Sequence, residues 1–540
     1  MKETQVNALE RRLKKNSWSD YLTGGQLLLL LAILLLGILV RVVGIGEAPR
    51  GFNQDEASAG YDAFAIAKYG IDRNGIHNPV HLIAWGSGQN VAYSWLCMPF
   101  IALLGLSVWS VRLPMALVGC VSLVIFYFLL KNIHRENKAF VLLGTFLFAI
   151  FPWHIMKSRW GLESNLFPDL VLWGTFLLSQ YLKNEKPGWF YGALALFAFS
   201  AYAYGTAYCF LPFFVLPVLL WMLVKKKISW KRLLAGGGLM GLLMVPILLF
   251  VFINTFKYPE IDLGLLTVPR LYTARHTSVA SVFSKDFFHS SWKNFLASLK
   301  ILVVQYDDAP WNAIRRYGMT YPFTLPLALW GLVLCFRRFF RGKAPDSENL
   351  MDFWFCSCVV LMFVSAPNIN RMNIVVIPWM YFTIVGTANV ARHLPRGKTL
   401  AVTAYALCFC LFCRSYFTSY QERIGQEFFS GLGPAISEAS QTEAGTVYVT
   451  DTVNMPYIYT LFFTETDVRD FRATVRYETS HVSFEEVGSF GKYVFHIPET
   501  IDEGENAAYV VSQKELEKFD LETFQVTQYD NYYLCERTNP

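Results

Sequence analysis

The chain has 540 residues, of which 54% are hydrophobic, 16% are aromatic and only 16% are charged, and its mean hydropathy is +0.33. Soluble domains carry about 25% charged residues, so the composition excludes an ordinary soluble protein and predicts a membrane protein with soluble parts attached. The net charge of +6 is modest, and no basic run is long enough to indicate a nucleic-acid-binding protein.

The chain begins with a polar, basic segment over residues 1–23, which leads into an apolar run over residues 24–43. This run is too long for the core of a signal peptide, and no small-residue cleavage site closes it. We therefore expect a retained first transmembrane helix.

Further apolar runs predict a polytopic α-helical membrane protein with about eleven transmembrane helices within residues 24–418. Beyond the first, the runs lie near residues 109–131, 138–156, 165–182, 189–205, 207–224, 232–254, 323–340, 352–366, 372–391 and 399–418. A twelfth candidate, residues 90–106, contains Pro99 and several polar residues. We assign it to an interfacial or re-entrant helix.

The distribution of basic residues supports that assignment. If residues 90–106 do not cross, every basic connection falls on the side of the basic N-terminus, as the positive-inside rule requires. These connections are residues 131–138, 183–188, 225–232, 337–343 and 392–398. The expected topology is a multi-pass protein of the cell membrane with a cytoplasmic N-terminus, external loops at 44–108 and 255–322, and an external C-terminus.

From residue 419 to residue 540 the composition becomes that of a small soluble α/β domain. Strands are expected at 445–450, 491–497 and 507–511, helices at 454–463 and 512–519, and a hairpin over 524–537. No motif in this domain carries assignable chemistry, and we expect a binding or lid role.

Two adjacent carboxylates, Asp55 and Glu56, stand at the start of a helical pattern in the first external loop. One interpretation makes Asp55 the helix N-cap and Glu56 a first-turn acid favoured by the helix dipole; the other makes them catalytic. The two are compatible, because a capped helix holds a carboxylate at a fixed position. We expect this helix to lie along the membrane surface with its apolar face down.

The other external loops contain more candidate residues. Lys157, Arg159 and Glu163 lie in a short loop between two expected spans, and cations that stay outside are expected to face an anion such as a phosphate. Asp169 falls inside the next span, where a carboxylate is costly and indicates function. Arg371 lies at an external helix end among asparagines and could bind a phosphate bidentately.

Aromatic and polar residues of the loops are candidates for substrate binding, because aromatic faces with amide and imidazole donors are a usual way to hold a sugar. The first loop is rich in Gly, Asn, His and aromatic residues, and a polar and aromatic cluster precedes the span near 323–340. The candidates are Tyr61, Trp85, Asp308, Trp311 and Asn312.

With these segments in view, the sequence resembles the membrane glycosyltransferases of the GT-C class. In particular, it resembles the bacterial family-39-like enzymes related to protein O-mannosyltransferases and the aminoarabinose transferase. The resembling segments are PRGFNQDEASAGYDAF, WGSGQNVAYSWLCMPFIALLGLSVWSVRLPMAL, SRWGLESNLFP and NINRMNIVVIP. The similarity covers about residues 20–420. It implies a GT-C-like catalytic domain over residues 24–418 that uses a polyprenyl-phosphate-linked sugar donor and an acceptor entering from outside.

The resemblance also implies roles for individual residues. Asp55 would be the general base, Glu56 its acidic neighbour, and Glu163 lies in the loop where the family often has a second acid. The expected reaction is a direct, inverting displacement. The leaving phosphate would be contacted by Arg371, Lys157 and Arg159.

Two other classes of function remain open at this stage. A transporter or flippase of lipid-linked glycans would have polar residues through the middle of its spans, and the expected spans are nearly free of them. A non-catalytic membrane scaffold would leave the acids and Arg371 without a purpose. The expected acceptor is a component of the cell envelope, and a glycan, a lipid and a protein all stay open. No metal site is assigned; a divalent cation at the paired acids stays open because the ligand set is incomplete.

Overall fold

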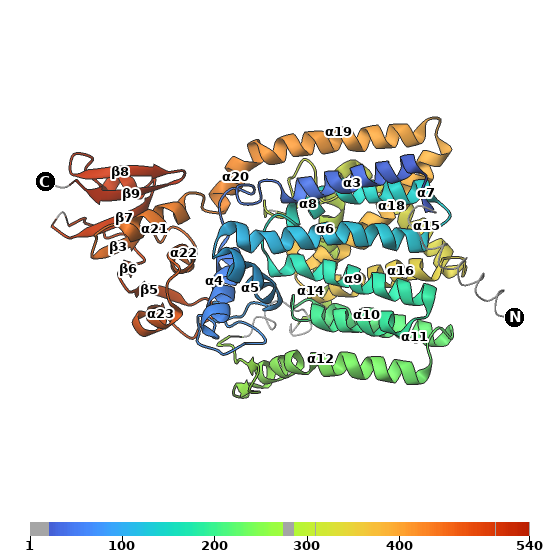
Figure 1. Cartoon of the computed structure of the whole chain (residues 1–540), viewed down its shortest axis with the longest axis horizontal. Coiled ribbons are helices and arrows are strands. Elements are labelled where there is room, and N and C mark those ends of the chain that lie inside the picture. Colours follow the sequence, from blue (N-terminus) through green and yellow to red (C-terminus); the bar gives the residue numbers. More distant parts are fainter. Residues whose placement is uncertain (1–20, 274–285, 308, 503, 539–540) are drawn as a thin grey trace, which may run out of the picture.

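The computed structural model describes residues 21–273, 286–307, 309–502 and 504–538. A bundle of helices over residues 24–417 is followed by a domain built around a β-sheet, and the two lie end to end along the long axis of the molecule (Figure 1). The fold class expected from the sequence is confirmed: a polytopic helical protein with a C-terminal α/β domain.

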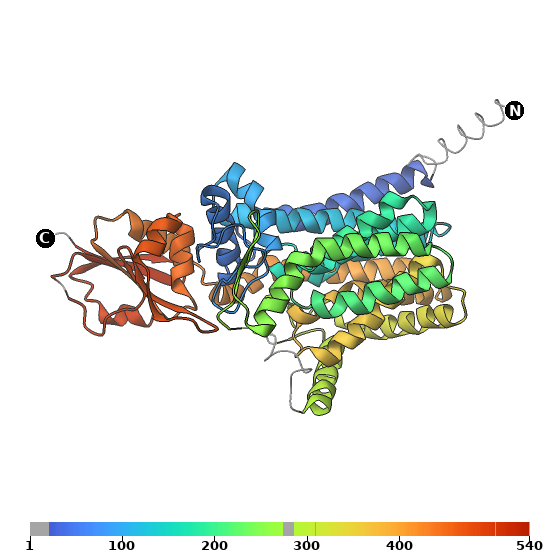
Figure 2. The same cartoon turned by 90° about the horizontal axis from the view of Figure 1, so that it is seen from below.

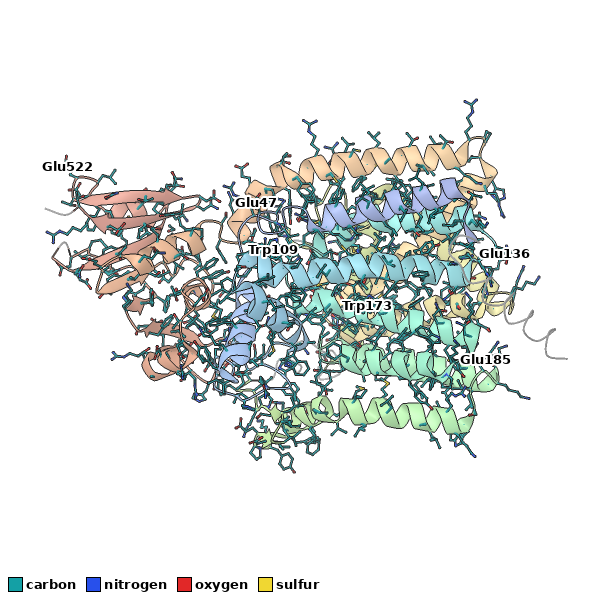
Figure 3. All side chains as sticks on the ribbon, in the orientation of Figure 1. Glu47, Trp109, Glu136, Trp173, Glu185 and Glu522 are labelled. Carbon is teal, nitrogen blue, oxygen red and sulfur yellow. The ribbon has the colours of Figure 1, made fainter. Side chains whose placement is uncertain are left out.

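The bundle consists of long helices joined by short connections at one end and by longer ones at the other. The helices are α3 (Gly24–Val42), α4 (Gln54–Tyr69), α5 (Ala92–Leu104), α6 (Val108–Ile133), α7 (Lys138–Ile150), α8 (Pro152–Lys157), α9 (Glu163–Asn184), α10 (Pro187–Ser200), α11 (Ala207–Val224), α12 (Trp230–Phe256), α14 (Phe287–Val304), α15 (Leu325–Phe340), α16 (Asp346–Val364), α17 (Ile369–Met372), α18 (Val376–His393) and α19 (Gly397–Phe417). Glu136 and Glu185 mark the end far from the C-terminal domain, and Glu47 and Trp109 mark the near end (Figure 3).

A helix is present at each of the eleven expected spans, but the count of eleven spans is not confirmed. Within the described part of the chain, eight helical segments are long and apolar enough to cross a membrane: α3, α6, α11, α12, α15 with the turn before it, α16, α17 continued by α18, and α19. The other three differ in length or polarity. Helices α7 and α10 have 13 and 14 residues, and α9 begins with a polar stretch that contains Glu163 and Asp169.

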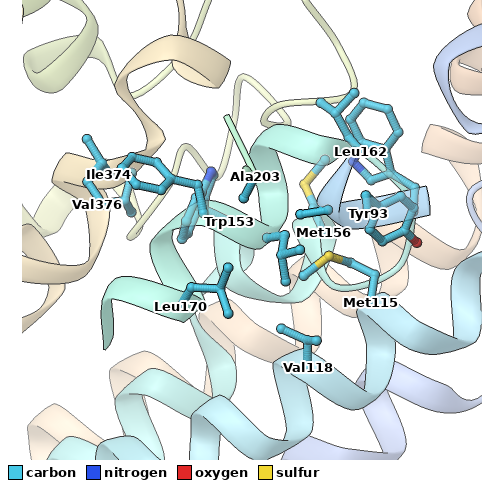
Figure 4. Packing of buried hydrophobic residues seen from close by; sticks show 14 of the residues in the cluster. Tyr93, Met115, Val118, Trp153, Met156, Leu162, Leu170, Ala203, Ile374 and Val376 are labelled. Carbon is cyan, nitrogen blue, oxygen red and sulfur yellow. The ribbon is translucent and has the colours of Figure 1, made fainter. Parts of the chain in front are cut away.

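Close packing explains how the bundle holds together. Helices α15 and α18 approach at two glycines: a Cβ on Gly331 would lie 1.8 Å from the Phe382 carbonyl oxygen, and one on Gly386 would lie 1.9 Å from the Leu327 carbonyl oxygen. Small residues permit this contact between helix backbones. Below the near end of the bundle, buried apolar side chains such as Tyr93, Met115, Trp153 and Met156 interlock (Figure 4).

The helix α5, expected as an interfacial or re-entrant segment, has 13 residues, fewer than the roughly 20 that a helix needs to cross a membrane. It packs against α4 and α6 and lies with α4 between the spanning helices and the C-terminal domain (Figure 1).

The C-terminal domain contains a seven-stranded mixed sheet in the order β4-β5-β6-β3-β7-β9-β8. The strands are β3 (Thr446–Val449), β4 (Arg476–Thr479), β5 (Glu486–Phe490), β6 (Tyr493–Val494), β7 (Ala507–Ser512), β8 (Phe524–Tyr529) and β9 (Tyr532–Arg537). Strand β3 is parallel to β6 and β7, and β8 and β9 form the expected terminal hairpin. Its helices are α20 (Ser419–Glu427), α21 (Leu432–Gln441), α22 (Pro456–Phe463) and α23 (Val468–Thr474).

Helix α22 packs directly on α4, so the C-terminal domain is docked on the first connection of the bundle. The ring of Phe462 lies 4.7 Å from that of Phe52, and a Cβ on Gly60 would lie 2.8 Å from the Phe462 ring. An ion pair of 2.8 Å joins Arg50 to Asp530 at the edge of the same contact. The domain therefore supports the segment that contains Asp55 and Glu56.

Candidate active site

Helix α4 begins one residue before Asp55, and its cap is Asn53. The Asn53 side chain accepts the Asp55 N–H at 2.9 Å, and the Glu56 carboxylate accepts the Asn53 N–H at 3.2 Å, which completes a capping box. The expectation that Asp55 is the N-cap is therefore wrong. The helix is also not a membrane-surface helix, because residues 56–66 are buried against α5, α6 and α22.

Glu56 is buried in an ion pair with Arg112 of α6. Two hydrogen bonds of 2.8 Å join the guanidinium to the carboxylate, and both side chains are fully buried. The same carboxylate accepts the Gly161 N–H at 2.7 Å, and Arg112 also donates to the carbonyls of Pro49 and Gly51 at 2.7 Å. Glu56 thus ties α4 to α6 and to the loop before α9.

Asp55, one residue earlier, lines a cavity of about 380 Å³. Adjacent positions on a helix are about 100° apart, which explains why the two neighbouring acids have different surroundings. The cavity is formed where α4, the loop 81–90, the first turn of α9, the start of α11, Phe250 of α12, the end of α16 and α17 converge. Its polar lining includes Asp55, Gln89, Asn90, Glu163, Tyr208 and Arg371.

Glu163 enters the cavity from the first turn of α9. Its carboxylate accepts the backbone N–H of Asn90 in a short hydrogen bond, and the Asn90 side chain donates to the Tyr208 hydroxyl at 3.4 Å. The contact fixes the second acid against the loop 81–90. The structure therefore brings two of the three predicted acids, Asp55 and Glu163, to one cavity.

Arg371 reaches the cavity from the short helix α17. Asn368 caps this helix by accepting the Arg371 N–H at 2.8 Å, and the Asp307 carboxylate accepts the Ile369 N–H at 2.8 Å. The Arg371 side chain donates to the Ala366 carbonyl at 3.1 Å. Since this is its one hydrogen bond among the described residues, its other N–H groups are available to an anion.

The predicted phosphate ligands Lys157 and Arg159 do not reach the cavity. Lys157 is buried and pairs with Asp169, which also lies 3.4 Å from His154. Arg159 donates to backbone carbonyls at the C-terminal end of α3, including Val40 at 2.8 Å. The unpaired carbonyls of a helix end attract cations, so Arg159, like Lys157, has a structural partner and needs no bound phosphate.

A second arginine, Arg41 of α3, belongs to the same buried set. It is fully buried and contacts the His154 ring nitrogen Nδ1 at 2.9 Å. We use the name buried ion-pair layer for six residues that lie outside the cavity lining and join helices of the near end: Arg41, Glu56, Arg112, Lys157, Arg159 and Asp169.

The predicted substrate residues have separate locations. Trp85 lines the cavity, whereas Tyr61 is buried and donates its hydroxyl to the Thr466 carbonyl at 2.7 Å. Asn312 donates to Asp307 at 3.0 Å, and the Trp311 ring lies 6.3 Å from that of Phe428; neither lines the cavity. The remaining candidate, Asp308, lies outside the described residues.

Sequence reasoning did not assign Gln89, Asn90, His81 or Tyr208 to the site. For the residues of the first loop the signal was the Gly-, Asn- and His-rich character of residues 69–95, and Tyr208 lies outside that segment. Burial lowers the pKa of His81 to about 4, so its imidazole is neutral at pH 7. It stacks on Phe250 with ring centroids 4.1 Å apart, and its Nδ1 lies 2.9 Å from the Leu82 carbonyl. The second ring nitrogen is then an acceptor, suited to a hydroxyl and not to a phosphate.

A chain of contacts connects Arg73, which is buried, to the cavity wall. Its guanidinium lies 4.5 Å from the centre of the Trp85 ring and donates to the Ser58 hydroxyl at 2.8 Å. Ser58 donates to Gln89 at 2.7 Å, and the Gln89 amide donates to the Asp55 carbonyl at 3.3 Å. We call Arg73, Ser58 and Gln89 the support chain. It orients Trp85 and the first turn of α4.

The C-terminal domain contacts the same wall. The Glu485 N–H donates to the Trp85 carbonyl at 3.0 Å, and the Tyr457 ring lies 6.2 Å from the Trp85 ring in an edge-to-face contact. A Cβ on Gly86, which has a φ of +100°, would lie 2.2 Å from the Val482 carbonyl oxygen. The domain thus forms part of the backing of the cavity.

No group of three or more His, Cys, Asp or Glu side chains that could hold a metal ion occurs in the described part of the chain. The oxygen donors of the cavity that suit a divalent cation are the carboxylates of Asp55 and Glu163 and the amide oxygens of Gln89 and Asn90.

Residues 89–261 match the family model of the dolichyl-phosphate-mannose-protein mannosyltransferases. Among solved structures, the chain is similar to ArnT from Cupriavidus metallidurans bound to undecaprenyl phosphate, with 13% identity, a TM-score of 0.53, and 95% of this chain and 98% of that chain covered. The apo state of the same protein gives 14% identity and a TM-score of 0.50, with 95% and 97% covered. These likenesses establish a shared fold.

The apo oligosaccharyltransferase of Archaeoglobus fulgidus is also similar, with 10% identity and a TM-score of 0.49 over 82% of this chain. The chain spans 64% of the length of that archaeal protein. No curated protein matches the sequence.

Proposed function

We propose that this chain, a membrane glycosyltransferase of the GT-C class and of the protein-mannosyltransferase and ArnT type, transfers a sugar from a polyprenyl-phosphate donor to an acceptor in the cavity near its C-terminal domain. The observation that carries the proposal is the convergence of Asp55, Glu163 and Arg371 on one cavity of about 380 Å³. The three come from segments more than 100 residues apart in the sequence. A carboxylate that takes the acceptor proton and a cation that binds the leaving phosphate are the groups that a direct displacement uses.

The donor is inferred from the relatives. The matching family model is named for dolichyl-phosphate-mannose, and ArnT was solved with undecaprenyl phosphate. Among the described lining residues, Arg371 is the one cation that can bind such a phosphate, because its guanidinium presents several donors in a planar fork. Trp85 and the neutral His81 offer an aromatic face and a hydrogen-bond acceptor to the sugar.

In the proposed reaction an acceptor hydroxyl or amine attacks the anomeric carbon from the face opposite the phosphate. The new bond to the acceptor forms as the bond between the anomeric carbon and the phosphate oxygen breaks, and its electron pair stays with the phosphate. Asp55 takes the acceptor proton, a contribution of typically 10²–10⁴-fold. Arg371 stabilises the charge of the departing polyprenyl phosphate, and direct displacement inverts the anomeric centre.

Glu163 is proposed to position the acceptor or the sugar. Its carboxylate is held by the Asn90 N–H, which orients one oxygen. The sugar passes through an oxocarbenium-like state, which a nearby carboxylate stabilises. Lys157, Arg159 and Glu56 are left out of the proposed chemistry, because each is buried among structural partners.

We propose that the cavity opens on the outer side of the membrane. The basic connections, such as residues 131–138 and 183–188, lie at the end marked by Glu136 and Glu185, away from the C-terminal domain (Figure 3). The positive-inside rule assigns that end to the cytoplasm. The acceptor would then be a glycan, lipid or protein of the cell envelope.

The test uses the purified full-length protein in lipid. It is incubated with polyprenyl-phosphate sugars and a crude envelope acceptor fraction, and release of polyprenyl phosphate is measured with transfer of the labelled sugar. We expect release and transfer to occur together. Flipping of a lipid-linked glycan across vesicles, without cleavage of any donor, would support a transporter and contradict the proposal.

A further inference from the structure

Helix α14 presents an apolar face away from the protein. Its exposed residues Phe288, Trp292, Leu296, Leu299 and Val303 recur every three or four positions, so they share one side of the helix. Phe288 is 86% exposed and Trp292 55% exposed. In a helix that faced water on this side, such a stripe would be unfavourable.

A neighbouring side of α14, about 90° around the helix from the stripe, attaches it to the bundle. Ser291, Ser298 and Leu302 are buried, and the Phe295 ring stacks on Phe363 of α16 with centroids 4.3 Å apart. Two small polar residues, Ser291 and Ser298, thus face the protein together with Phe295 and Leu302, while the five large apolar side chains of the stripe stay exposed.

The helix also has an unusual direction. It runs across the spanning helices, not along them, and projects sideways from the bundle at the end nearer the C-terminal domain (Figure 2). If the spanning helices follow the membrane normal, α14 lies in the plane of the membrane near its surface. Exposed Lys293 and Lys300 are seven residues apart and therefore lie on one flank of the helix, beside the apolar stripe.

Two connections bring α14 close to the cavity. The end of α16 carries Phe363, which contacts α14, between Leu361 and Val364, which line the cavity. After α14 the chain reaches Asp307, whose carboxylate accepts the N–H of Ile369, the first residue of α17. Helix α17 also contains Arg371.

We propose that α14 is an interfacial helix whose apolar face is embedded at the boundary between the headgroups and acyl chains of the bilayer. The lysine flank meets the anionic headgroups, as in amphipathic helices that lie on membranes. The bilayer is the occupant that fits, because α14 packs on the spanning helix α16, the spanning helices also expose large apolar side chains, and the stripe is bordered by cations. Resting on the proposed function, we assign to α14 the wall along which a polyprenyl-phosphate donor in the same leaflet reaches the cavity.

The contact is tested by photocrosslinking with the full-length protein in nanodiscs that contain phosphatidylglycerol and phosphatidylcholine. Benzoylphenylalanine replaces Phe288, Trp292 or Leu296 in turn, and Leu521, which is 69% exposed in the C-terminal domain, is the matched control. Mass spectrometry should find lipid adducts at the three α14 positions and none at Leu521. Adducts to a second copy of the chain, or no adducts at α14, would overturn the proposal.

The second arm measures kinetics of the double variant Phe288→Ser, Trp292→Ser. The KM for a long-chain polyprenyl-phosphate donor should rise while kcat is unchanged, and a short-chain, water-soluble donor should be used as well as by the wild type. An equal loss with both donors would contradict a role in lipid delivery. If no donor is cleaved by the wild type, the proposed function fails, while lipid adducts at α14 would still establish its place in the bilayer.

Discussion

The cavity and the buried ion-pair layer contain the same kinds of side chain within a few residues of each other, yet their surroundings differ. In the layer, Glu56 and Arg112 are fully buried and satisfy each other, and Arg159 is satisfied by backbone carbonyls. In the cavity, Asp55, Glu163 and Arg371 are only partly buried and line open space. A charge in this part of the protein is therefore no sign of chemistry by itself; what separates the two regions is whether the charged side chain is sealed among structural partners or lines a cavity.

Among variants that distinguish the cavity from the buried ion-pair layer, a change at Asp55 is expected to have the largest effect on turnover. The variant Asp55→Asn should reduce turnover by about 10²–10⁴-fold, the usual contribution of a general base, and should unfold at the same temperature as the wild type. Transfer kinetics of the purified protein measure the turnover, and thermal unfolding measures its stability. Glu47→Gln, which removes an exposed carboxylate from the same connection, is the matched control. Wild-type turnover in Asp55→Asn would remove Asp55 as the base.

Glu56 should behave in the opposite way. Glu56→Gln leaves Arg112 as an uncompensated buried cation, and breaking a buried pair costs about 3–5 kcal/mol. We expect a lower unfolding temperature and a poor yield of folded protein, measured by size-exclusion chromatography and thermal unfolding in detergent. A variant that is as stable as the wild type but inactive would show that Glu56 has a catalytic role and not the structural role proposed here.

Arg371 should affect donor binding and phosphate departure. Hydrogen bonds to charged groups contribute about 1.5–3 kcal/mol, so Arg371→Ala should lower kcat/KM by roughly 10–150-fold. Arg371→Lys should recover only part of the loss, because a lysine cannot bind bidentately. The matched comparison is Arg159→Lys, a cation of the layer, for which we expect a loss of stability and no specific rise in the KM for donor.

The smallest effect is expected from the support chain. Ser58→Ala removes the hydroxyl between Arg73 and Gln89, and a neutral hydrogen bond contributes about 0.5–1.5 kcal/mol. We expect a drop in kcat of roughly 2–10-fold with little change in stability, measured with a saturating donor. An unchanged kcat would show that Trp85 and the first turn of α4 are oriented without this chain.

The architecture was predictable because it depends on patterns that involve residues close together in the sequence. Apolar runs and basic connections located the helices, and the turn at Asp530 and Asn531 located the terminal hairpin. The expected helix over 512–519 is only a short 3-10 turn at Glu515–Lys518, and β4 and β5 were missed because their residues show little alternation. Helix α14 was missed because its loop was judged by its charges, although its stripe of aromatic residues was visible in the sequence.

The site was only partly predictable, because the role of each charged residue depends on which distant residues contact it in the fold. Locally, Glu56 differs from Asp55 only by its capping-box spacing from Asn53, and no local signal separates Arg371 from Arg159. Their different roles arise when α6 places Arg112 beside Glu56 and the end of α3 receives Arg159. The same holds for α4, whose modest apolar face suggested a membrane surface until α22 of the C-terminal domain was seen to cover it. Contacts across hundreds of residues cannot be inferred from spacing along one chain.

The most direct measurement is a structure of the Asp55→Asn protein in nanodiscs with a bound polyprenyl-phosphate sugar. The account predicts the phosphate within hydrogen-bond distance of Arg371 and the anomeric carbon in the cavity between residue 55 and Glu163, with its open face toward residue 55. A donor whose phosphate is bound instead by Lys157, Arg159 or Arg112, with the cavity empty, would contradict the central claim.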